Sequence, residues 1–238
     1  MARDVVLKAD QVNKRKRRYR VIKLALLLLL LFLTVIYILL RVIYNEGRFT
    51  ITLDSNDTLK SGLAMFESLN NSQGKRKLEA TPIRSMDNIS YKWIPENIDT
   101  EADGSHNGKN YIAYSFYVEN QGTEVLNYWY EVAIDNIIKG VDDAVRIRIY
   151  RNGKQITYAK KNPIDNTPEE GTTPFREDVE SKENIVILEQ VEDFKPNDLD
   201  RYTIVIWLEG DDPDCVDAII GGELKMHMKF TEEHIEKW

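Results

Sequence analysis

Residues 24–40 read LALLLLLLFLTVIYILL, a run of seventeen side chains without a charge. An α-helix rises 1.5 Å per residue, so this run spans about 25 Å, and the flanking apolar residues extend it to roughly the 30 Å hydrocarbon thickness of a bilayer. A helix that is apolar on every face at this length is typical of a membrane span, and not of a core helix in a soluble protein. The run therefore predicts one transmembrane helix over residues 21–44.

The residues after this run distinguish an uncleaved anchor from a signal peptide that is removed. A signal peptide has a shorter apolar stretch, followed by small residues in an Ala-x-Ala-like pattern. Here the chain continues as RVIYNEGR over residues 41–48, which contains bulky side chains and no such pattern. We expect an uncleaved signal anchor.

Charge is distributed unevenly on the two sides of the run. Residues 14–20 read KRKRRYR, and residues 1–23 hold nine basic side chains against two acidic ones. Residues 48–238 hold 22 basic and 36 acidic side chains, a net charge of −14. Because basic flanks stay on the cytoplasmic side, we expect residues 1–20 to form a cytoplasmic tail and residues 48–238 an extracytoplasmic domain. The predicted location is the cell membrane, in a single pass.

The same features restrict the partners and the means of stabilisation. An acidic domain repels nucleic acid, so we expect the lipid bilayer as a partner of the anchor and no nucleic-acid partner. Cys215 is the single cysteine of the chain, so the domain holds no internal disulfide. It is nevertheless long enough to bury a sizeable core.

Two-residue alternation of apolar and polar side chains dominates the domain. Residues 223–230 read ELKMHMKF, which predicts a strand with one buried and one solvated face. Residues 144–160 predict a hairpin, because Asn152-Gly153 favours a type I′ turn between two alternating segments.

Further strands are predicted from aromatic and β-branched residues. The strong ones are residues 111–119 and 126–134, separated by a turn at 120–122, and residues 202–208 (YTIVIWL), which we expect to be covered on both faces. Weaker strands are predicted at residues 49–53, 75–81, 89–94 and 185–190, and loops at residues 96–109 and 162–181. About eight to ten strands with short turns predict an all-β domain, an antiparallel sandwich or jelly roll.

The residue types that catalysis commonly uses are few. The histidines are His106, His227 and His234, and the His-Glu-x-x-His pattern of zinc proteases does not occur. His227 falls on the polar face of its strand, where we expect it to be solvated. No spacing pairs Cys215 with a histidine, so we interpret it as a small buried residue on a short helix. We therefore expect no catalytic residues and no enzymatic activity.

One acidic stretch is a candidate site. Residues 209–217 read EGDDPDCVD, and carboxylate oxygens on one loop are ligands that calcium prefers. Calcium is the one cofactor that the sequence suggests, with these candidate metal ligands: Glu209, Asp211, Asp212, Asp214 and Asp217. The favoured alternative is helix capping, in which Asp212 precedes a helix that begins at Pro213 and ends at Gly221-Gly222.

Aromatic residues on the two strong strands form a second candidate surface. They offer either a carbohydrate-binding platform or, as we prefer, core and cross-strand packing. The residues concerned are Tyr111, Tyr114, Tyr117, Tyr128, Trp129 and Tyr130.

Two segments carry a resemblance to known proteins. Residues 111–130 (YIAYSFYVENQGTEVLNYWY) and residues 194–230, which contain IVIWLEGDDPDCVDAIIGGELKMHMKF, resemble uncharacterised single-pass proteins of clostridia and related Firmicutes, together with the anchor and the run SHNGKNYIAY at residues 105–114. A strand followed by Asn-x-Gly, and a late strand that ends in a tryptophan motif, are similar to the TasA/camelysin group. That similarity implies a jelly-roll domain at a Gram-positive cell surface. It carries over no zinc motif.

Two functions of different classes follow from these patterns. We favour a membrane-anchored, non-enzymatic surface module that binds a surface protein or polysaccharide, or assembles with further copies of itself. The alternative is a calcium-dependent surface hydrolase or carbohydrate-binding enzyme that uses the acidic loop at residues 209–217. A cleft that gathers three or more carboxylates would favour the alternative.

Overall fold

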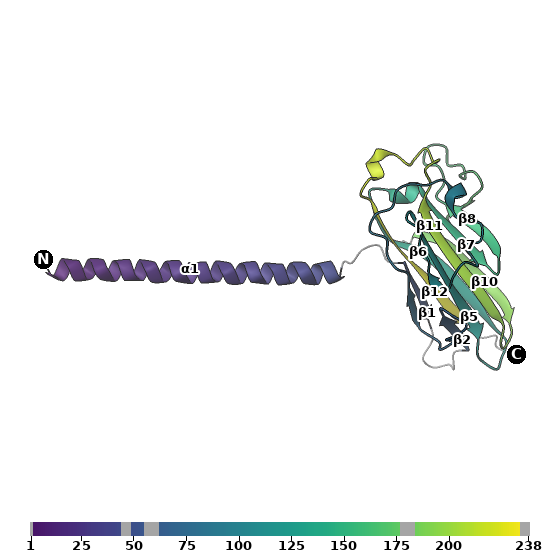
Figure 1. Cartoon of the computed structure of the whole chain (residues 1–238), viewed down its shortest axis with the longest axis horizontal. Helices are drawn as coiled ribbons and strands as arrows, with labels where there is room; N and C mark the ends of the chain where they lie inside the picture. Colours follow the sequence, from purple (N-terminus) through teal and green to yellow (C-terminus); the bar gives the residue numbers. More distant parts are fainter. Residues whose placement is uncertain (1, 44–48, 55–61, 177–183, 234–238) are drawn as a thin grey trace. The chain divides into compact units, whose positions relative to one another are not determined.

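The structure is a computed structural model, which describes residues 2–43, 49–54, 62–176 and 184–233. The chain separates into two compact units, Met1–Asn45 and Glu46–Trp238. Each unit is described by itself (Figure 1).

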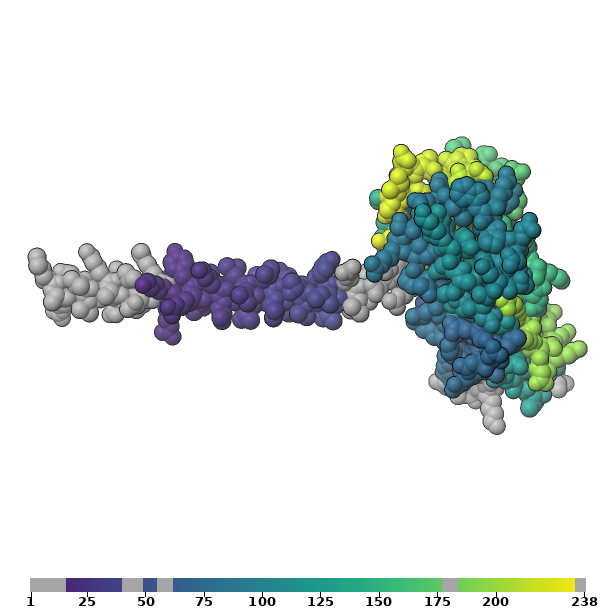
Figure 2. Space-filling view, viewed as in Figure 1, coloured from purple at the N-terminus to yellow at the C-terminus, as the bar shows by residue number. Residues whose placement is uncertain are grey.

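The first unit is a single helix, α1 (Ala2–Ile43). Its segment Lys16–Leu39 is long and apolar enough to cross a membrane, and it presents leucine side chains on its surface (Figure 2). The hydroxyl of Thr34 donates a hydrogen bond of 2.7 Å to the carbonyl of Leu31, so this polar group has a partner within the helix. The prediction of one apolar helix is confirmed; Tyr44, its predicted end, lies outside the described residues.

The second unit consists of two sheets. The five-stranded sheet has the order β10-β6-β12-β1-β3 and the seven-stranded sheet the order β2-β5-β11-β7-β8-β9, with β4 beside β5. The strands of the first are β1 (Phe49–Asp54), β3 (Lys77–Glu79), β6 (Leu126–Ile138), β10 (Asn184–Phe194) and β12 (Glu223–Glu233). Those of the second are β2 (Leu63–Phe66), β4 (Gly104–Ser105), β5 (Tyr111–Asn120), β7 (Val145–Arg151), β8 (Lys154–Ala159), β9 (Thr173–Pro174) and β11 (Leu199–Leu208). Three short 3₁₀ helices lie between strands: η1 (Tyr91–Trp93), η2 (Val141–Asp143) and η3 (Asp217–Ile219).

The all-β sandwich is confirmed, with one refinement. Most neighbouring strands are antiparallel, but β1 runs parallel to β12 and β8 parallel to β9, so the sheets are mixed. The turn at residues 120–122 does not close a hairpin: β5 before it and β6 after it belong to opposite sheets.

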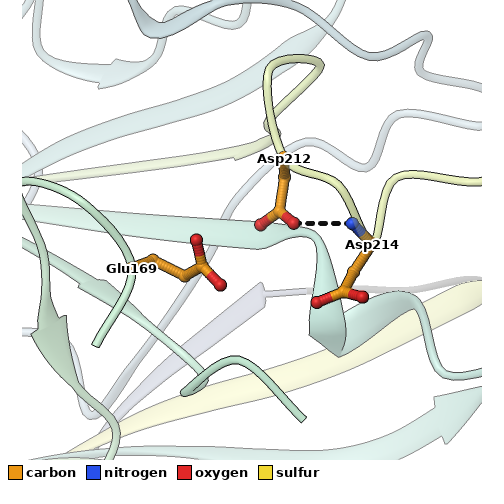
Figure 3. Close-up of side chains that lie close together, drawn as sticks. All are labelled: Glu169, Asp212 and Asp214. Carbon is orange, nitrogen blue, oxygen red and sulfur yellow. Dashed lines mark hydrogen bonds between the residues drawn. The ribbon is translucent and has the colours of Figure 1, made fainter. Parts of the chain in front are cut away.

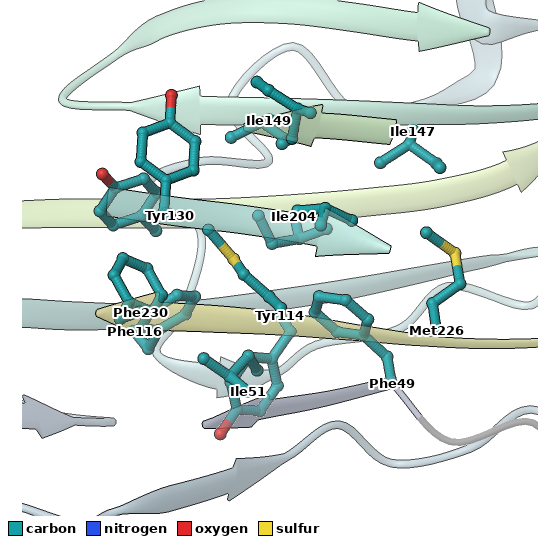
Figure 4. Close-up of a cluster of buried hydrophobic side chains, with 14 of the residues drawn as sticks. Phe49, Ile51, Tyr114, Phe116, Tyr130, Ile147, Ile149, Ile204, Met226 and Phe230 are labelled. Atoms are coloured by element: carbon teal, nitrogen blue, oxygen red, sulfur yellow. The ribbon is translucent and has the colours of Figure 1, made fainter. Parts of the chain in front are cut away.

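The core lies between the two sheets (Figure 4). The alternation seen in β12 places Met226, Met228 and Phe230 inside, all at 2 % exposure or less, while Lys225 is exposed. The Phe230 ring meets Phe116 of the opposite sheet edge to face, with centroids 5.8 Å apart, a favourable geometry for aromatic pairs. Apolar burial across the two sheets therefore holds the sandwich together.

The hairpin prediction is confirmed by the backbone. Strands β7 and β8 pair antiparallel from Arg146 with Ala159 to Arg151 with Lys154. Asn152 and Gly153 have φ of 51° and 78°, the left-handed values that a type I′ turn requires at both central positions.

The outer face of the seven-stranded sheet is covered, which the alternation in β7 does not predict. Residues 89–94 form no strand; Ile89 makes one bridge to Glu209, and residues 91–93 form η1. Ile89, Ile94 and Ile98 pack on Trp207 and on further outward-facing residues of the sheet: Ala113, Tyr150 and Val205. Strand β11 is thereby buried on both faces, as predicted.

Candidate functional site

The loop after β11 does not contain the helix that the capping interpretation requires. In the segment of residues 210–222 the structure has turns and the short helix η3, which begins after Val216. Asp212 Oδ1 instead accepts a hydrogen bond of 2.8 Å from the backbone N–H of Asp214. Helix capping by Asp212 is therefore wrong, because the carboxylate closes a local turn. Cys215 lies half-buried in this turn rather than on a helix, 3.2 Å from the side-chain nitrogen of Asn88.

The second oxygen of Asp212 forms a buried ion pair. Arg146 Nη2 lies 2.5 Å from Asp212 Oδ2, and the two side chains are 6 % and 0 % exposed. Arg146 reaches this position from the outer face of β7. Because each charge is removed from water, each depends on the other for compensation.

Asp212 also lies close to two other carboxylates, those of Glu169 and Asp214 (Figure 3). The carboxylate oxygens of Glu169, Asp212 and Asp214 lie within 4.8 Å of one another, and Glu169 Oε2 is 3.6 Å from Arg146 Nη2. Glu169 Oε1 and Asp214 Oδ2 are buried, and among the described residues neither has a hydrogen-bond partner. Burial, followed by the charge of Asp212, raises the pKa of both carboxyl groups above the ordinary range.

This group replaces the predicted calcium set. Asp212 and Asp214 belong to it, whereas Glu209, Asp211 and Asp217 do not. Glu209 Oε2 accepts hydrogen bonds from Trp207 Nε1 at 2.9 Å and from the Tyr91 backbone N–H. Asp211 Oδ2 accepts one from Ser90 Oγ at 2.8 Å. Asp217 is exposed at the start of η3. Glu169 was not predicted, since it lies in the loop at residues 162–181 and no sequence pattern relates that loop to the acidic stretch.

A cleft of about 700 Å³ opens beside these carboxylates. We call it the β7–β11 cleft, because Arg146, Arg148 and Trp207 of these strands line it. The Arg148 guanidinium carbon lies 5.0 Å from the centre of the Trp207 ring, within the range of cation–π contacts. Its other walls come from Tyr91-Lys92, Thr157, residues 169–172, Glu209 and residues 211–213. This cleft is the candidate functional site.

Four of the six residues of the predicted aromatic platform are buried, and the other two, Tyr111 and Trp129, are half-buried. Tyr114, Tyr117, Tyr128 and Tyr130 are buried at 5 % exposure or less, in agreement with the packing alternative. Their hydroxyl groups donate to carboxylates of Glu67, Asp103, Asp200 and Glu189, respectively. Burial raises the pKa of each of these tyrosines. Among the described residues of the β domain, two exposed aromatic residues lie on η1, where Tyr91 is 49 % and Trp93 71 % exposed.

The histidines have structural partners where the structure describes them. His106 Nδ1 and Nε2 lie 2.9 Å and 3.0 Å from the carbonyls of Gly104 and Ile98. His227 Nδ1 lies 2.7 Å from Asp135 Oδ1 and its ring is half-buried, so it is less solvated than predicted. His234 lies outside the described residues. Neither described ring contacts the cleft lining or Cys215 through a hydrogen bond.

Comparison with protein-family models, curated proteins and solved structures finds no match to this chain. The resemblance to clostridial single-pass proteins and to the TasA/camelysin group therefore stays a prediction.

Proposed function

We propose that the protein is a membrane-anchored, non-enzymatic surface module that binds its ligand in the β7–β11 cleft. The observation that carries this proposal is that charged residues of the cleft wall form contacts with other residues of that wall. Arg146 pairs with Asp212, and Glu209 holds Trp207 and the backbone of Tyr91. These contacts make a rigid, pre-formed wall, which favours binding. Among the described cleft residues, the hydroxyl groups of Thr157 and Thr172 bond to Arg148 and to a backbone carbonyl, and not to a general base that would activate them.

The proposed placement rests on the sequence and on α1. Lys16–Leu39 supplies a segment able to span a bilayer, and the basic residues 14–20 favour a cytoplasmic N-terminus. The β domain then lies outside the membrane, where its cleft meets ligands of the cell surface. A domain that is held at the membrane can bind a ligand that lies beside it in the cell envelope.

Two experiments test the two halves of this proposal. A protease added to intact cells should digest the β domain and spare the basic tail, and a protected domain would contradict the orientation. Purified full-length protein in lipid nanodiscs should co-sediment with envelope fragments of the cells that produce it. Tyr91→Ala should weaken this co-sedimentation, whereas Lys225→Ala, at an exposed position of β12, should not. Absence of co-sedimentation for the unmodified protein would contradict the binding function.

A second candidate is a calcium-dependent function of the same cleft, whose lining meets the condition stated above for this alternative, since it gathers more than three carboxylates. The observation in its favour is the pair of buried oxygens, on Glu169 and Asp214, that lack a hydrogen-bond partner in the described part of the chain. With Asp212 and Arg146 the group carries a formal charge of −2, which one calcium ion would neutralise. If calcium binds, millimolar CaCl₂ should raise the Tm of the β domain, and Glu169→Gln should abolish the rise. Equal Tm values in CaCl₂ and EDTA would reject this candidate.

A further inference from the structure

The position of the β7–β11 cleft restricts what it can bind. Strand β7 pairs with β11 and β8, and β11 pairs with β5 and β7, so neither strand has a free edge. An extended peptide that adds a strand to a sheet needs such an edge. A ligand of this cleft must therefore bind through side chains on the outer face of the sheet.

The polar side chains that remain available in the cleft are of both signs. Arg148 uses Nε to bond Thr157 Oγ1 at 2.9 Å and stacks on Trp207, and within the described residues it has no ion pair. Lys92 also lacks an ion pair there, and its Nζ lies 5.6 Å from the centre of the Tyr91 ring. Glu170 and Asp211 are exposed carboxylates that line the same cleft. Donors and acceptors thus face the same space.

This balance favours a neutral ligand that both donates and accepts hydrogen bonds. A polyanion would meet Glu170 and Asp211 in a domain whose net charge is −14, and a polycation would meet Arg148 and Lys92. Vicinal hydroxyl groups, by contrast, bond equally well to guanidinium and to carboxylate groups. A sugar ring also presents an apolar face, for which a cleft with an exposed aromatic side chain is suited.

Tyr91 is that side chain. It lines the cleft and is 49 % exposed, although its backbone N–H is held by Glu209 Oε2 at 3.1 Å. A tyrosine side chain has only two rotatable torsions, so little ordering entropy is lost when a ligand covers it. The volume of about 700 Å³ falls within the range of small-ligand sites.

We propose that the β7–β11 cleft binds a neutral glycan, with Tyr91 against a sugar face and Arg148, Glu170 and Asp211 on its hydroxyl groups. This inference rests on the proposed binding function and names the ligand class of that same site. It needs no metal ion and no covalent step. The carbohydrate surface is thus formed by η1 and the outer face of the sheet, and not by the buried tyrosines of β5 and β6.

The test uses full-length protein in phosphatidylcholine nanodiscs, which contain no sugar detergent. Binding is measured by saturation-transfer NMR and titration against neutral hexasaccharides of glucose, mannose and N-acetylglucosamine. Oligogalacturonate serves as an acidic glycan and a casein digest as a peptide mixture. We expect at least one neutral hexasaccharide to bind, and Tyr91→Ala and Arg148→Gln each to weaken it at least tenfold. Trp93→Ala is the matched control: Trp93 is exposed on the same turn but does not line the cleft, so binding should change less than twofold.

The outcomes separate this inference from the proposed function. Binding of the peptide mixture or of oligogalacturonate alone, reduced by Tyr91→Ala, would overturn the glycan inference and leave the binding module intact. Glycan binding that both cleft variants retain would place the glycan elsewhere and also overturn the inference. If the unmodified protein binds none of the probes and no envelope fragments, the proposed binding function itself is contradicted.

Discussion

Arg146 Nη2 lies 2.5 Å from Asp212 Oδ2, and this pair joins the outer face of β7 to the loop after β11. Both side chains are almost fully buried. Loss of one partner from such a pair leaves an uncompensated charge in a poorly solvated place, which costs more than the pair contributes. The stability of the cleft wall should therefore depend on Asp212.

We expect Asp212→Ala to lower the free energy of unfolding by about 3–5 kcal/mol. Asp212→Asn should cost less but should not be silent, because the amide keeps the acceptor for the Asp214 N–H and loses the charge that compensates Arg146. Denaturant unfolding of full-length protein in nanodiscs measures both. Arg146→Met combined with Asp212→Asn should recover part of the loss. A silent Asp212→Asn would show that the ion pair contributes nothing.

A substitution at Trp207 tests the packing of Ile89, Ile94 and Ile98 on the outer face of the seven-stranded sheet. The side chain is 1 % exposed and donates a hydrogen bond of 2.9 Å to Glu209. Trp207→Ala should cost roughly 3–5 kcal/mol through the cavity that it creates. Lys225→Ala, on the exposed face of β12, should change stability by less than about 0.5 kcal/mol. Equal losses in thermal unfolding would mean that the segment over Trp207 adds no packing.

The sequence predicts local features of this fold well. The apolar run of α1, the alternation of β12 and the Asn152-Gly153 turn are each determined by residues within one element, so periodicity and turn chemistry reveal them. The all-β class of the domain follows from the number of strands that the sequence predicts. Residues 89–94 were mistaken for a strand because their apolar residues, Ile89 and Ile94, pack on the sheet from outside it.

The candidate site is less predictable because it depends on contacts between distant segments. The sequence predicts Asp212 as a metal ligand or a helix cap, but its partner in the ion pair, Arg146, lies 66 residues away. In an alternating strand an arginine normally marks a solvated face. The outer face of the seven-stranded sheet is partly buried because the segment of residues 89–98 packs on it. Glu169 enters the same group from a loop, where no periodicity restricts the position of a side chain.

The buried tyrosines give a test at alkaline pH. Burial is the largest cause that raises the pKa of each of five phenols: Tyr114, Tyr128, Tyr130, Tyr158 and Tyr202. A phenol whose pKa is higher in the folded state contributes stability below its unfolded pKa of about 10, and this stability is lost as pH rises further. In an ultraviolet titration these tyrosines should ionise only when the domain unfolds, above about pH 10. Reversible ionisation of all tyrosines near pH 10 with the fold intact would contradict their burial.

Glu169 gives the opposite test, at acid pH. Burial and the charge of Asp212 raise the pKa of Glu169 and of Asp214 in the folded state. For a carboxyl group with a raised pKa the ionised form is the unfavourable one. The folded state therefore loses stability as pH rises from the unfolded pKa, about 4.3 for glutamate, through the folded value.

Removal of the Glu169 charge should consequently help most at neutral pH. In EDTA, Glu169→Gln should have a Tm at or above that of the unmodified protein at pH 7.5, and the difference should shrink as the pH falls toward 5. Glu170→Gln is the matched control, since Glu170 is an exposed neighbour and its substitution should shift Tm equally at all pH values. A Glu169→Gln variant that is less stable at pH 7.5 in EDTA, with the gap closing as pH falls, would mean that the carboxylate is stabilised as an anion by Arg146. The three carboxylates would then stay ionised in the folded state, and protonation would not stabilise it.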